Sequence, residues 1–360
     1  MNILMTISQN RPFQKLWLSG FASGTARWIE VFCFSVISWQ NTQDAVIVGH
    51  LMTLRMAGVI LAAIFFVNFG GNYSGQRVMV LALAVCCLGS FAGLISSPAV
   101  ANFPMTHNPP ADLVAFALIS FFSGALWSVD FSFRRRMLGD SLPKNLVIAG
   151  ISFDVMSSHA TRLIAMLIGG AILASGSIVG LFTLLGIIYA ISGLSLIGAP
   201  DSEYTSEKIP AREVFAQARK RFPLKLVLSL TPIFNIFILP CLALIAPFLL
   251  ERFSLEKLLL GSVSAVEGFG ALAGGFALAL INPVKRLSVF VSALLGSLLS
   301  LLLLTSEVNL FLVTGILFFT GILSSTYSAM QSSIIYLNSA PSLRSSTFSL
   351  LTIGIGIGLI

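Results

Sequence analysis

Charge is the scarcest property of this sequence. Only 10% of its 360 residues are Asp, Glu, Lys or Arg, 56% are hydrophobic, and the mean hydropathy is +0.94. Soluble domains carry about a quarter charged residues. A water-soluble core cannot absorb so much apolar surface, so the composition predicts an all-α protein embedded in lipid.

Other absences exclude several function classes. The four cysteines lie inside apolar segments without disulfide or metal-ligand spacing, and His50 and His107 have no ligand partners nearby, so we expect no metal site. The sequence has no Gly-rich phosphate loop of the Walker type, so ATP as an energy source is not indicated and no cofactor is expected. No nucleophile–base arrangement indicates an enzyme.

The sequence contains eleven apolar segments instead. Ten are about 19 to 28 residues long, enough to cross a bilayer with some tilt. The eleventh has 13 residues before the chain stops and has no polar cap, so we expect its helix to continue past Ile360. The segments are 16–39, 46–69, 78–97, 113–133, 146–173, 178–198, 226–250, 258–281, 287–305, 310–336 and 348–360.

The positions of the 21 Lys and Arg residues predict orientation. With a cytoplasmic N-terminus, 16 of them fall in inside regions, only Arg252 and Lys257 fall outside, and three lie within segments. Cytoplasmic loops of membrane proteins are enriched in Lys and Arg. The N-terminus is therefore predicted to be cytoplasmic, and the net charge of +7 does not indicate nucleic-acid binding.

One polar stretch divides the chain. Residues 199–225 carry mixed charges and contain a predicted helix at 211–222. They separate six segments in residues 1–198 from five in residues 226–360. This layout is typical of a transporter built from a duplicated six-helix half, with the second half incomplete. A weak sequence similarity between Leu138–Pro143 and Leu337–Pro341 agrees with a duplication.

The opening NRPFQKLWLSG (residues 10–20) resembles the start of major facilitator superfamily (MFS) proteins. It is similar to the branch of bacterial efflux permeases that includes enterobactin-exporter-like and macrolide-efflux proteins. Further matches are Val48-Gly49 with Leu54-Arg55, and the stretch from Leu138 to Ile168 with Gly169-Gly170 after it. The resemblance implies a twelve-helix fold, alternating access, a bacterial inner membrane and a small-molecule substrate. We expect a monomer.

The match to the family is incomplete at its cytoplasmic gate. Asn72 stands where the family has Asp, and only Gly75 and Arg77 of the loop motif remain. Asp130 and Arg134 are four residues apart on one helical face, so we expect them to form a latch at the cytoplasmic side. The predicted gate comprises Asn72, Gly75, Arg77, Asp130 and Arg134.

Ionisable residues inside the apolar segments indicate a substrate or proton pathway, because charge at bilayer depth is costly to keep. The third, sixth, ninth and tenth segments have none. The resemblance places the third, sixth and ninth helices outside the central cavity, which agrees with this distribution. The predicted pathway residues are Arg27, Glu30, Arg55, Asp154, His159, Arg162 and Glu267.

Their spacing predicts how these charges group. Arg27 and Glu30 are close enough to pair, and Asp154 shares one helical face with Arg162. We expect Arg27, Arg55 and Arg162 to form an electropositive patch with Glu30 and Asp154 as counter-charges. Arg binds carboxylates and phosphates bidentately, which suits an anionic substrate. A closed salt-bridge network that only fastens helices is the alternative.

Glu267 is the single charge in the segments after residue 225, and no partner is evident in its own half. It is predicted to carry a proton or to attract a cation. The alternative is a neutral Glu that forms hydrogen bonds between helices.

The sequence as a whole predicts a secondary transporter. We expect proton-coupled export of a small anionic or amphiphilic solute, with protons passing through Glu30, Asp154 or Glu267. Two alternatives remain. One is uptake or facilitated diffusion of an anion, and the other is a membrane scaffold or sensor that transports nothing. The expected partners are the substrate, the lipid bilayer and protons.

Overall fold

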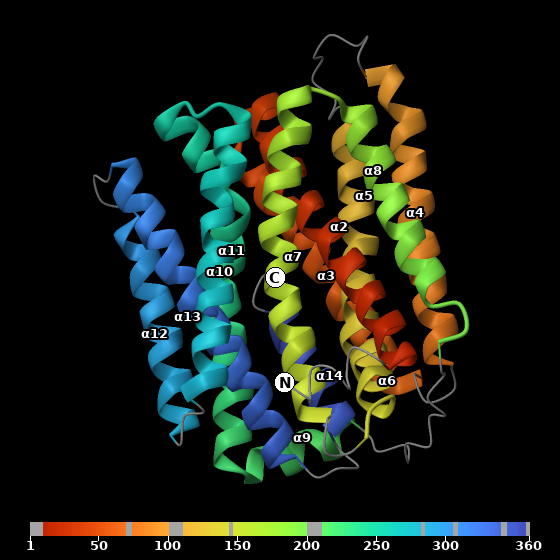
Figure 1. The fold of residues 1–360 in the computed structure, drawn as a ribbon, viewed down its shortest axis with the longest axis vertical. Helices are drawn as coiled ribbons and strands as arrows, with labels where there is room; N and C mark the ends of the chain where they lie inside the picture. Colours follow the sequence, from red (N-terminus) through yellow and green to blue (C-terminus); the bar gives the residue numbers. More distant parts are fainter. Residues whose placement is uncertain are drawn as a thin grey trace.

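The protein is a bundle of long helices (Figure 1), seen in a computed structural model. The structure describes residues 10–69, 74–100, 111–143, 147–199, 211–281, 285–304, 309–339 and 344–357. Helices are the regular elements of these described residues. The prediction of an all-α fold is therefore confirmed.

The helices that precede the polar connection are called the first helix set below. Each of its six long helices coincides within a few residues with a predicted segment. The fourth of them continues through a π-helical turn, η2 (Asp130–Arg134), into the short α6 (Arg135–Asp140). The long helices are α2 (Arg11–Thr42), α3 (Ala45–Phe69), α4 (Gly75–Val100), α5 (Ala111–Val129), α7 (Val147–Ser175) and α8 (Ile178–Ser195).

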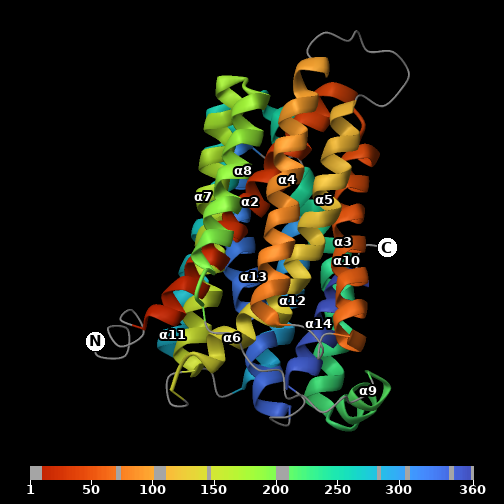
Figure 2. The same ribbon diagram turned by 90° about the vertical axis from the view of Figure 1, so that its right-hand side faces the viewer.

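The helices after the polar connection are called the second helix set. A short amphipathic helix, α9 (Ala211–Lys220), precedes them and lies at one end of the bundle, which we call the α9 end (Figure 2). The division of the chain at residues 198 and 226 stays a prediction. The second helix set comprises α10 (Phe222–Phe253), α11 (Lys257–Ile281), α12 (Arg286–Leu303), α13 (Leu310–Asn338) and α14 (Arg344–Ile357).

The bundle has the surface of a membrane protein. Within the described residues, nine helices are long and apolar enough to cross a bilayer. The more polar α2 is not one of the nine, although it has 32 residues, and 347–357 forms a shorter apolar helix. Large apolar side chains such as Leu88 and Phe311 face outward. The predicted number of about eleven spans stays a prediction.

The two helix sets meet along two seams. In the first, α7 packs against α11 so closely that a β-carbon on Gly170 would lie 2.8 Å from the Cα of Gly261. Small residues at helix interfaces permit such close approach in membranes. In the second seam α14 packs against α3, where Gly356 faces Ile60.

Buried apolar residues unite the sets at the end opposite α9 and, in a small cluster, between Met56 of α3 and Ala243 of α10. One cluster joins the first helix set to residues of the second that lie away from α9, such as Leu249, Leu260 and Val313. Toward the α9 end, a separate cluster includes Leu224, Val227 and other residues of the second set and α9. The sets therefore share a core at the end opposite α9 and the small α3–α10 cluster, whereas the cluster toward the α9 end belongs to α9 and the second set alone.

Two helix pairs repeat the same packing, α3 with α5 and α11 with α13. The sequence Phe-Phe-Ser-Gly at residues 121–124 recurs as Phe-Phe-Thr-Gly at residues 318–321. A β-carbon on Gly124 would clash with the carbonyl oxygen of Arg55, and one on Gly321 would clash with that of Glu267. Arg55 and Glu267 therefore occupy equivalent positions in the two pairs.

Candidate functional site

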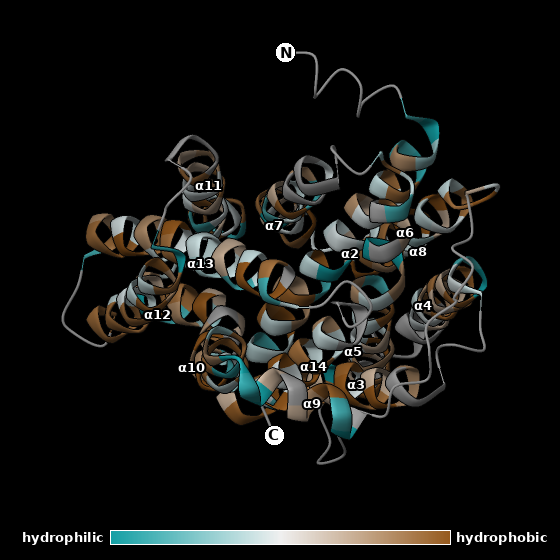
Figure 3. Ribbon diagram, turned by 90° about the horizontal axis from the view of Figure 1, so that it is seen from below, coloured by the Kyte–Doolittle hydropathy of each residue, from teal (hydrophilic) through white to brown (hydrophobic). Residues whose placement is uncertain are grey.

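A cavity of about 180 Å³ lies between the two helix sets. Its described lining residues come from α2, α3, α5, η2, α6 and α7 on one side and from α10, α13 and α14 on the other. None of them belongs to α4, α8 or α12, which lie at the flanks of the bundle (Figure 3). This confirms the expectation for the third, sixth and ninth segments.

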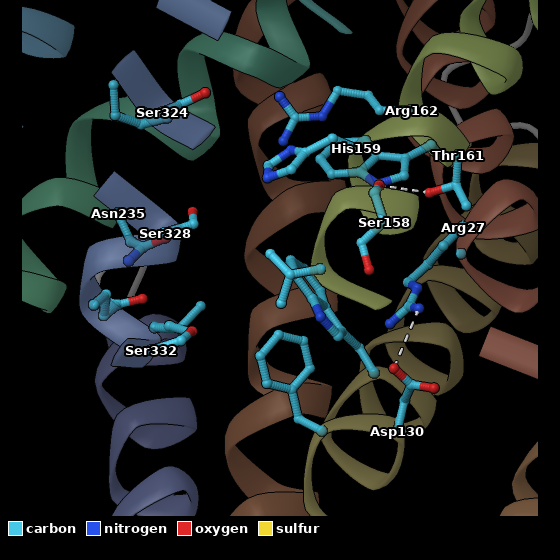
Figure 4. A pocket seen from close by; sticks show the side chains of 18 of the residues that line it. Arg27, Asp130, Ser158, His159, Thr161, Arg162, Asn235, Ser324, Ser328 and Ser332 are labelled. Atoms are coloured by element: carbon cyan, nitrogen blue, oxygen red, sulfur yellow. Dashed lines mark hydrogen bonds and ion pairs between the residues drawn. The ribbon is translucent and has the colours of Figure 1, made fainter. Parts of the chain in front are cut away.

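One side of the cavity carries the charges, and we call it the charged wall. On α7, Ser158 and His159 lie four and three residues before Arg162, so both are its neighbours on the cavity side of the helix. Figure 4 shows these side chains and Arg27 on the same side of the cavity. The charged wall consists of Arg27, Arg55, Asp130, Arg135, His159 and Arg162.

The opposite side, contributed by the second helix set, is polar but uncharged, and we call it the neutral wall (Figure 4). Apolar residues of α10 and α14 complete this side of the cavity. The neutral wall consists of Asn235, Ser324, Tyr327, Ser328, Gln331 and Ser332.

Arg55 is held in a closed network. Its Nη2 donates to Glu30 at 2.9 Å and its Nη1 donates to Ser123 at 2.8 Å, while the Tyr189 hydroxyl donates to Glu30 at 2.6 Å. These side chains are buried and tie together α2, α3, α5 and α8. The predicted pair of Arg27 with Glu30 is wrong, because Arg55 reaches the Glu30 carboxylate from the neighbouring helix.

Arg27 is held more loosely. Its Nη2 lies 3.9 Å from Asp130 Oδ2, and its guanidinium lies over the Trp127 ring at 5.4 Å. The buried Nη1 has no hydrogen-bond partner among the described residues. Arg27 therefore lines the cavity and keeps one donor without a partner.

Arg134 forms the centre of a second buried network. It donates to both oxygens of Asp130, at 2.5 and 3.2 Å, and to both oxygens of Asp154, at 2.7 and 3.2 Å. Gly20 of α2 leaves room for its guanidinium, since a β-carbon there would overlap it. The wider π-helical turn of η2, typical of functional sites, presents Arg134 to Asp154 on α7.

This network bears on two expectations. Asp130 and Arg134 pair as predicted, and the pair is buried inside the bundle; its role as a cytoplasmic latch stays a prediction. Asp154 neutralises Arg134 and lies 3.7 Å from Arg135, so it is not a counter-charge for Arg162. The predicted grouping of Asp154 with the three cavity arginines is wrong because the turn at η2 brings Arg134 closer.

Arg162 and Glu267 form an ion pair between the helix sets. Ser324 of α13 also donates to Glu267, at 3.3 Å, and the Arg162 guanidinium lies 4.4 Å from the centre of the Trp28 ring. Among the described residues, Glu267 has no charged partner in its own half, as expected. Its charged partner is Arg162, which comes from α7 across the seam. Arg162 Nε has no hydrogen-bond partner among the described residues.

The remaining predicted residues differ in position. His159 is buried at the cavity, between the levels of Ser158 and Arg162 on α7. Gly75 begins α4 and packs against Phe133 of η2, whereas the side chain of Arg77 is exposed at the surface. Asn72 lies outside the described residues.

The neutral wall and the position of Arg135 on the charged wall were not predicted from the sequence. Serines at every fourth position of α13, from Ser324 to Ser332, mark a polar face that could have been recognised. The repeated Phe-Phe-Ser/Thr-Gly sequence could have aligned Arg55 with Glu267.

Comparisons with known proteins agree with this architecture. A family model described as Major Facilitator Superfamily matches residues 16–360. The comparison with curated proteins finds no matching relative.

Several solved structures superpose on nearly the whole chain. The nucleoside transporter NupG matches with a TM-score of 0.71 and 11% identity, covering 97% of this chain and 89% of that one. A D-xylose–proton symporter gives 0.70 and 10%, covering 99% and 88%. The human organic anion transporter MFSD10 gives 0.68 and 13%, covering 97% and 91%.

Identities this low establish a shared fold and nothing about substrate, whereas the family match spans almost every residue. A central cavity between two packed helix sets, apolar outward faces and this match lead to one conclusion: the chain belongs to the Major Facilitator Superfamily, whose members are multi-pass membrane transporters.

Proposed function

We propose that the chain is a secondary active transporter that moves a small organic anion through the central cavity by alternating access. The observation that carries this proposal is the composition of the charged wall. Four arginines and one histidine line the cavity there, and Asp130 is the one carboxylate among the described lining residues.

The free donor capacity of these arginines supports anion binding. Arg27 Nη1 and Arg162 Nε have no hydrogen-bond partner among the described residues. A buried donor without a partner costs free energy that an anionic ligand can recover. Guanidinium groups also match the geometry of carboxylates and phosphates, and low local polarity strengthens the attraction.

The size of the cavity supports a small solute. Pockets for drug-sized ligands are about 300–1,000 Å³. The cavity between the helix sets is smaller, at about 180 Å³. A bulky macrolide-like cargo is therefore a poorer match in this conformation than a metabolite-sized anion. MFSD10, which shares this fold, is described as an organic anion transporter.

The packing of the two helix sets supports alternating access. Their shared core lies at the end opposite α9, whereas the cluster toward the α9 end belongs to α9 and the second set alone. The Arg162–Glu267 ion pair crosses the α7–α11 seam. Protonation of Glu267 would release Arg162, so we propose this carboxylate as the proton-coupling group.

Direction and location follow from the sequence pattern. The protein is placed in a bacterial inner membrane with its N-terminus in the cytoplasm. In this orientation the α9 end faces the cytoplasm. The similarity to bacterial efflux permeases favours export, and a monomer is the proposed functional unit. These assignments complete the proposal.

The test uses two matched sets of six-carbon probes on the purified full chain in detergent. The apolar set is hexanoate, hexylamine and hexanol, and the hydroxylated set is gluconate, glucamine and sorbitol. We expect a carboxylate to raise the melting temperature, and the matched amine and alcohol to have little effect. The stabilising carboxylate is then followed into proteoliposomes under a pH gradient.

The substitution Arg27→Gln provides the site-specific arm. It should remove carboxylate stabilisation and flux, because Arg27 borders the cavity with an unused donor. Arg212→Gln is the matched control, since Arg212 is exposed on α9 and does not line the cavity. Stabilisation by the amines instead, or no carboxylate flux in any direction, would contradict the proposal and favour a non-transporting protein.

A further inference from the structure

The two walls of the cavity differ in charge, and they come from different helix sets. The charged wall belongs entirely to the first helix set, and the neutral wall entirely to the second (Figure 4). A ligand that bridges the helix sets therefore meets guanidinium groups at one side and neutral hydrogen-bonding groups at the other. This asymmetry constrains the part of the ligand that is not charged.

The neutral wall follows one face of α13. Ser324, Ser328 and Ser332 repeat every fourth residue, and Gln331 lies beside them on the same face. Asn235 of α10 adds an amide from the neighbouring helix. Polar groups at this depth are costly to bury without hydrogen bonds, so a purely apolar cargo leaves them unsatisfied.

The hydrogen bonds within the wall leave acceptors and hydroxyls for a ligand. The Gln331 amide nitrogen donates to the Thr231 hydroxyl at 2.7 Å and to the Tyr327 hydroxyl at 3.0 Å. The Asn235 amide nitrogen donates to the Thr231 carbonyl at 2.8 Å. In both side chains the amide nitrogen is engaged, which leaves the carbonyl oxygen to accept.

The serines add unused groups. The hydroxyls of Ser328 and Ser332 form no hydrogen bond with another described residue, and both residues line the cavity. Together with the two amide oxygens, they form a set of donors and acceptors that matches alcohol groups, which both donate and accept.

We propose that the substrate is a polyhydroxylated organic anion, such as a sugar acid. Its anionic group binds Arg27 and Arg162, and its hydroxyls bind the neutral wall. This proposal rests on the proposed function and narrows it. A site built to hydrogen-bond a hydroxyl discriminates strongly against an analogue that lacks it, because its own polar groups are then left unpaired. Fatty, amphiphilic anions are therefore poor substrates.

The test compares three probes of equal carbon number by their dissociation constants for the full chain in detergent. Gluconate has both the anion and the hydroxyls, hexanoate only the anion, and sorbitol only the hydroxyls. We expect gluconate to bind at least about tenfold more tightly than hexanoate, and sorbitol more weakly than either. Tighter binding of hexanoate than of gluconate would overturn the inference but leave the anion-transport proposal standing.

Two variants locate the discrimination at the neutral wall. The double substitution Ser328→Ala/Ser332→Ala should weaken gluconate binding by about two- to tenfold per hydroxyl and leave hexanoate binding unchanged. Ser325→Ala is the matched control, because Ser325 is buried on the same helix but does not line the cavity.

The outcomes separate the two proposals. An equal loss of gluconate and hexanoate binding in the double variant, or no loss of either, would overturn the role of the neutral wall. Failure of every carboxylate to bind wild-type protein would instead overturn the anion-transport proposal on which it rests. Because neither serine has a hydrogen-bond partner among the described residues to lose, the double variant should elute as a folded protein in gel filtration, and so should Ser325→Ala.

Discussion

Arg55 and Glu267 occupy equivalent positions in two helix pairs that pack alike. The carbonyl group of each lies against a glycine of the partner helix, Gly124 on α5 or Gly321 on α13. Their charges are opposite, and their ion pairs run in different directions. Arg55 binds a carboxylate within the first helix set, whereas Glu267 binds an arginine of the other set.

The difference separates a structural ion pair from one that can respond to transport. Relative movement of the two helix sets leaves the Arg55 network intact, because all its members belong to one set. The same movement must strain or break the Arg162–Glu267 pair. Side-chain exposure agrees, at 2% and 0% for Arg55 and Glu30 against 12% and 4% for Arg162 and Glu267.

Removing the carboxylate from each ion pair should give the largest difference in stability between the two pairs. Glu30→Ala leaves the Arg55 charge buried without its counter-charge and should lower the free energy of unfolding by about 3–5 kcal/mol. Glu267→Ala should cost less, because Arg162 borders the cavity and stays over Trp28. Unfolding of both variants in mixed detergent micelles measures the two losses. Equal losses would show that the pairs are energetically alike.

The shared helix packing predicts a matched response at the glycines. Gly124→Ala and Gly321→Ala each place a β-carbon against a backbone carbonyl, so both should be destabilised to the upper end of the usual overpacking range of about 1–3 kcal/mol. Gly49→Ala and Gly315→Ala are controls on α3 and α13, since a β-carbon there meets nothing within 4 Å. The controls should be unchanged or slightly more stable. A large loss of stability in only one of the two helix pairs would show that the pairs are not equivalent.

The hydroxyl side chains one position before these glycines should contribute unequally to the free energy of unfolding. Ser123 accepts a hydrogen bond from Arg55, so Ser123→Ala should cost about 1.5–3 kcal/mol, the range for bonds to charged groups. Among the described residues, the partners of Thr320 are neutral, Ser300 and a backbone carbonyl, so Thr320→Val should cost about 0.5–1.5 kcal/mol. The same unfolding measurement tests this ranking, and a reversed order would contradict it.

The smallest effect on stability is expected for Glu267→Gln. Glutamine keeps the side-chain size and a neutral hydrogen bond to Ser324, so the free energy of unfolding should change by less than about 1.5 kcal/mol. Transport of gluconate should nevertheless lose its dependence on the pH gradient, because glutamine does not titrate. Glu213→Gln, on the exposed surface of α9, is the control. Retained proton dependence in the Glu267 variant would assign coupling to another group.

The helices were predictable because length and hydropathy are local properties. Every apolar segment coincides with a helix. The predicted polar helix that begins at Ala211 is also present. The ion pairs were not predictable in this way. The three-residue spacing of Arg27 and Glu30 suggested a pair, but Arg55 of the next helix approaches the carboxylate more closely.

The other pairings depend on geometry that no local pattern records. Arg134 reaches Asp154 because η2 is a π-helical turn rather than an α-helical one. Arg162 and Glu267 are 105 residues apart, and they meet because α7 and α11 pack along one seam. The sequence therefore indicated the charged residues of the cavity except Arg135, but most of their partners could not be read from it.

The apolar core that unites the helix sets at the end opposite α9 has a thermal consequence. Access from that end requires Leu249, Leu260 and Val313 to part from the first helix set, which exposes apolar surface to water. Exposure of apolar surface carries a positive heat-capacity change, and its cost falls on cooling. The balance between the two access states should therefore vary with temperature along a curve, and the barrier to exchange should not follow a simple Arrhenius line.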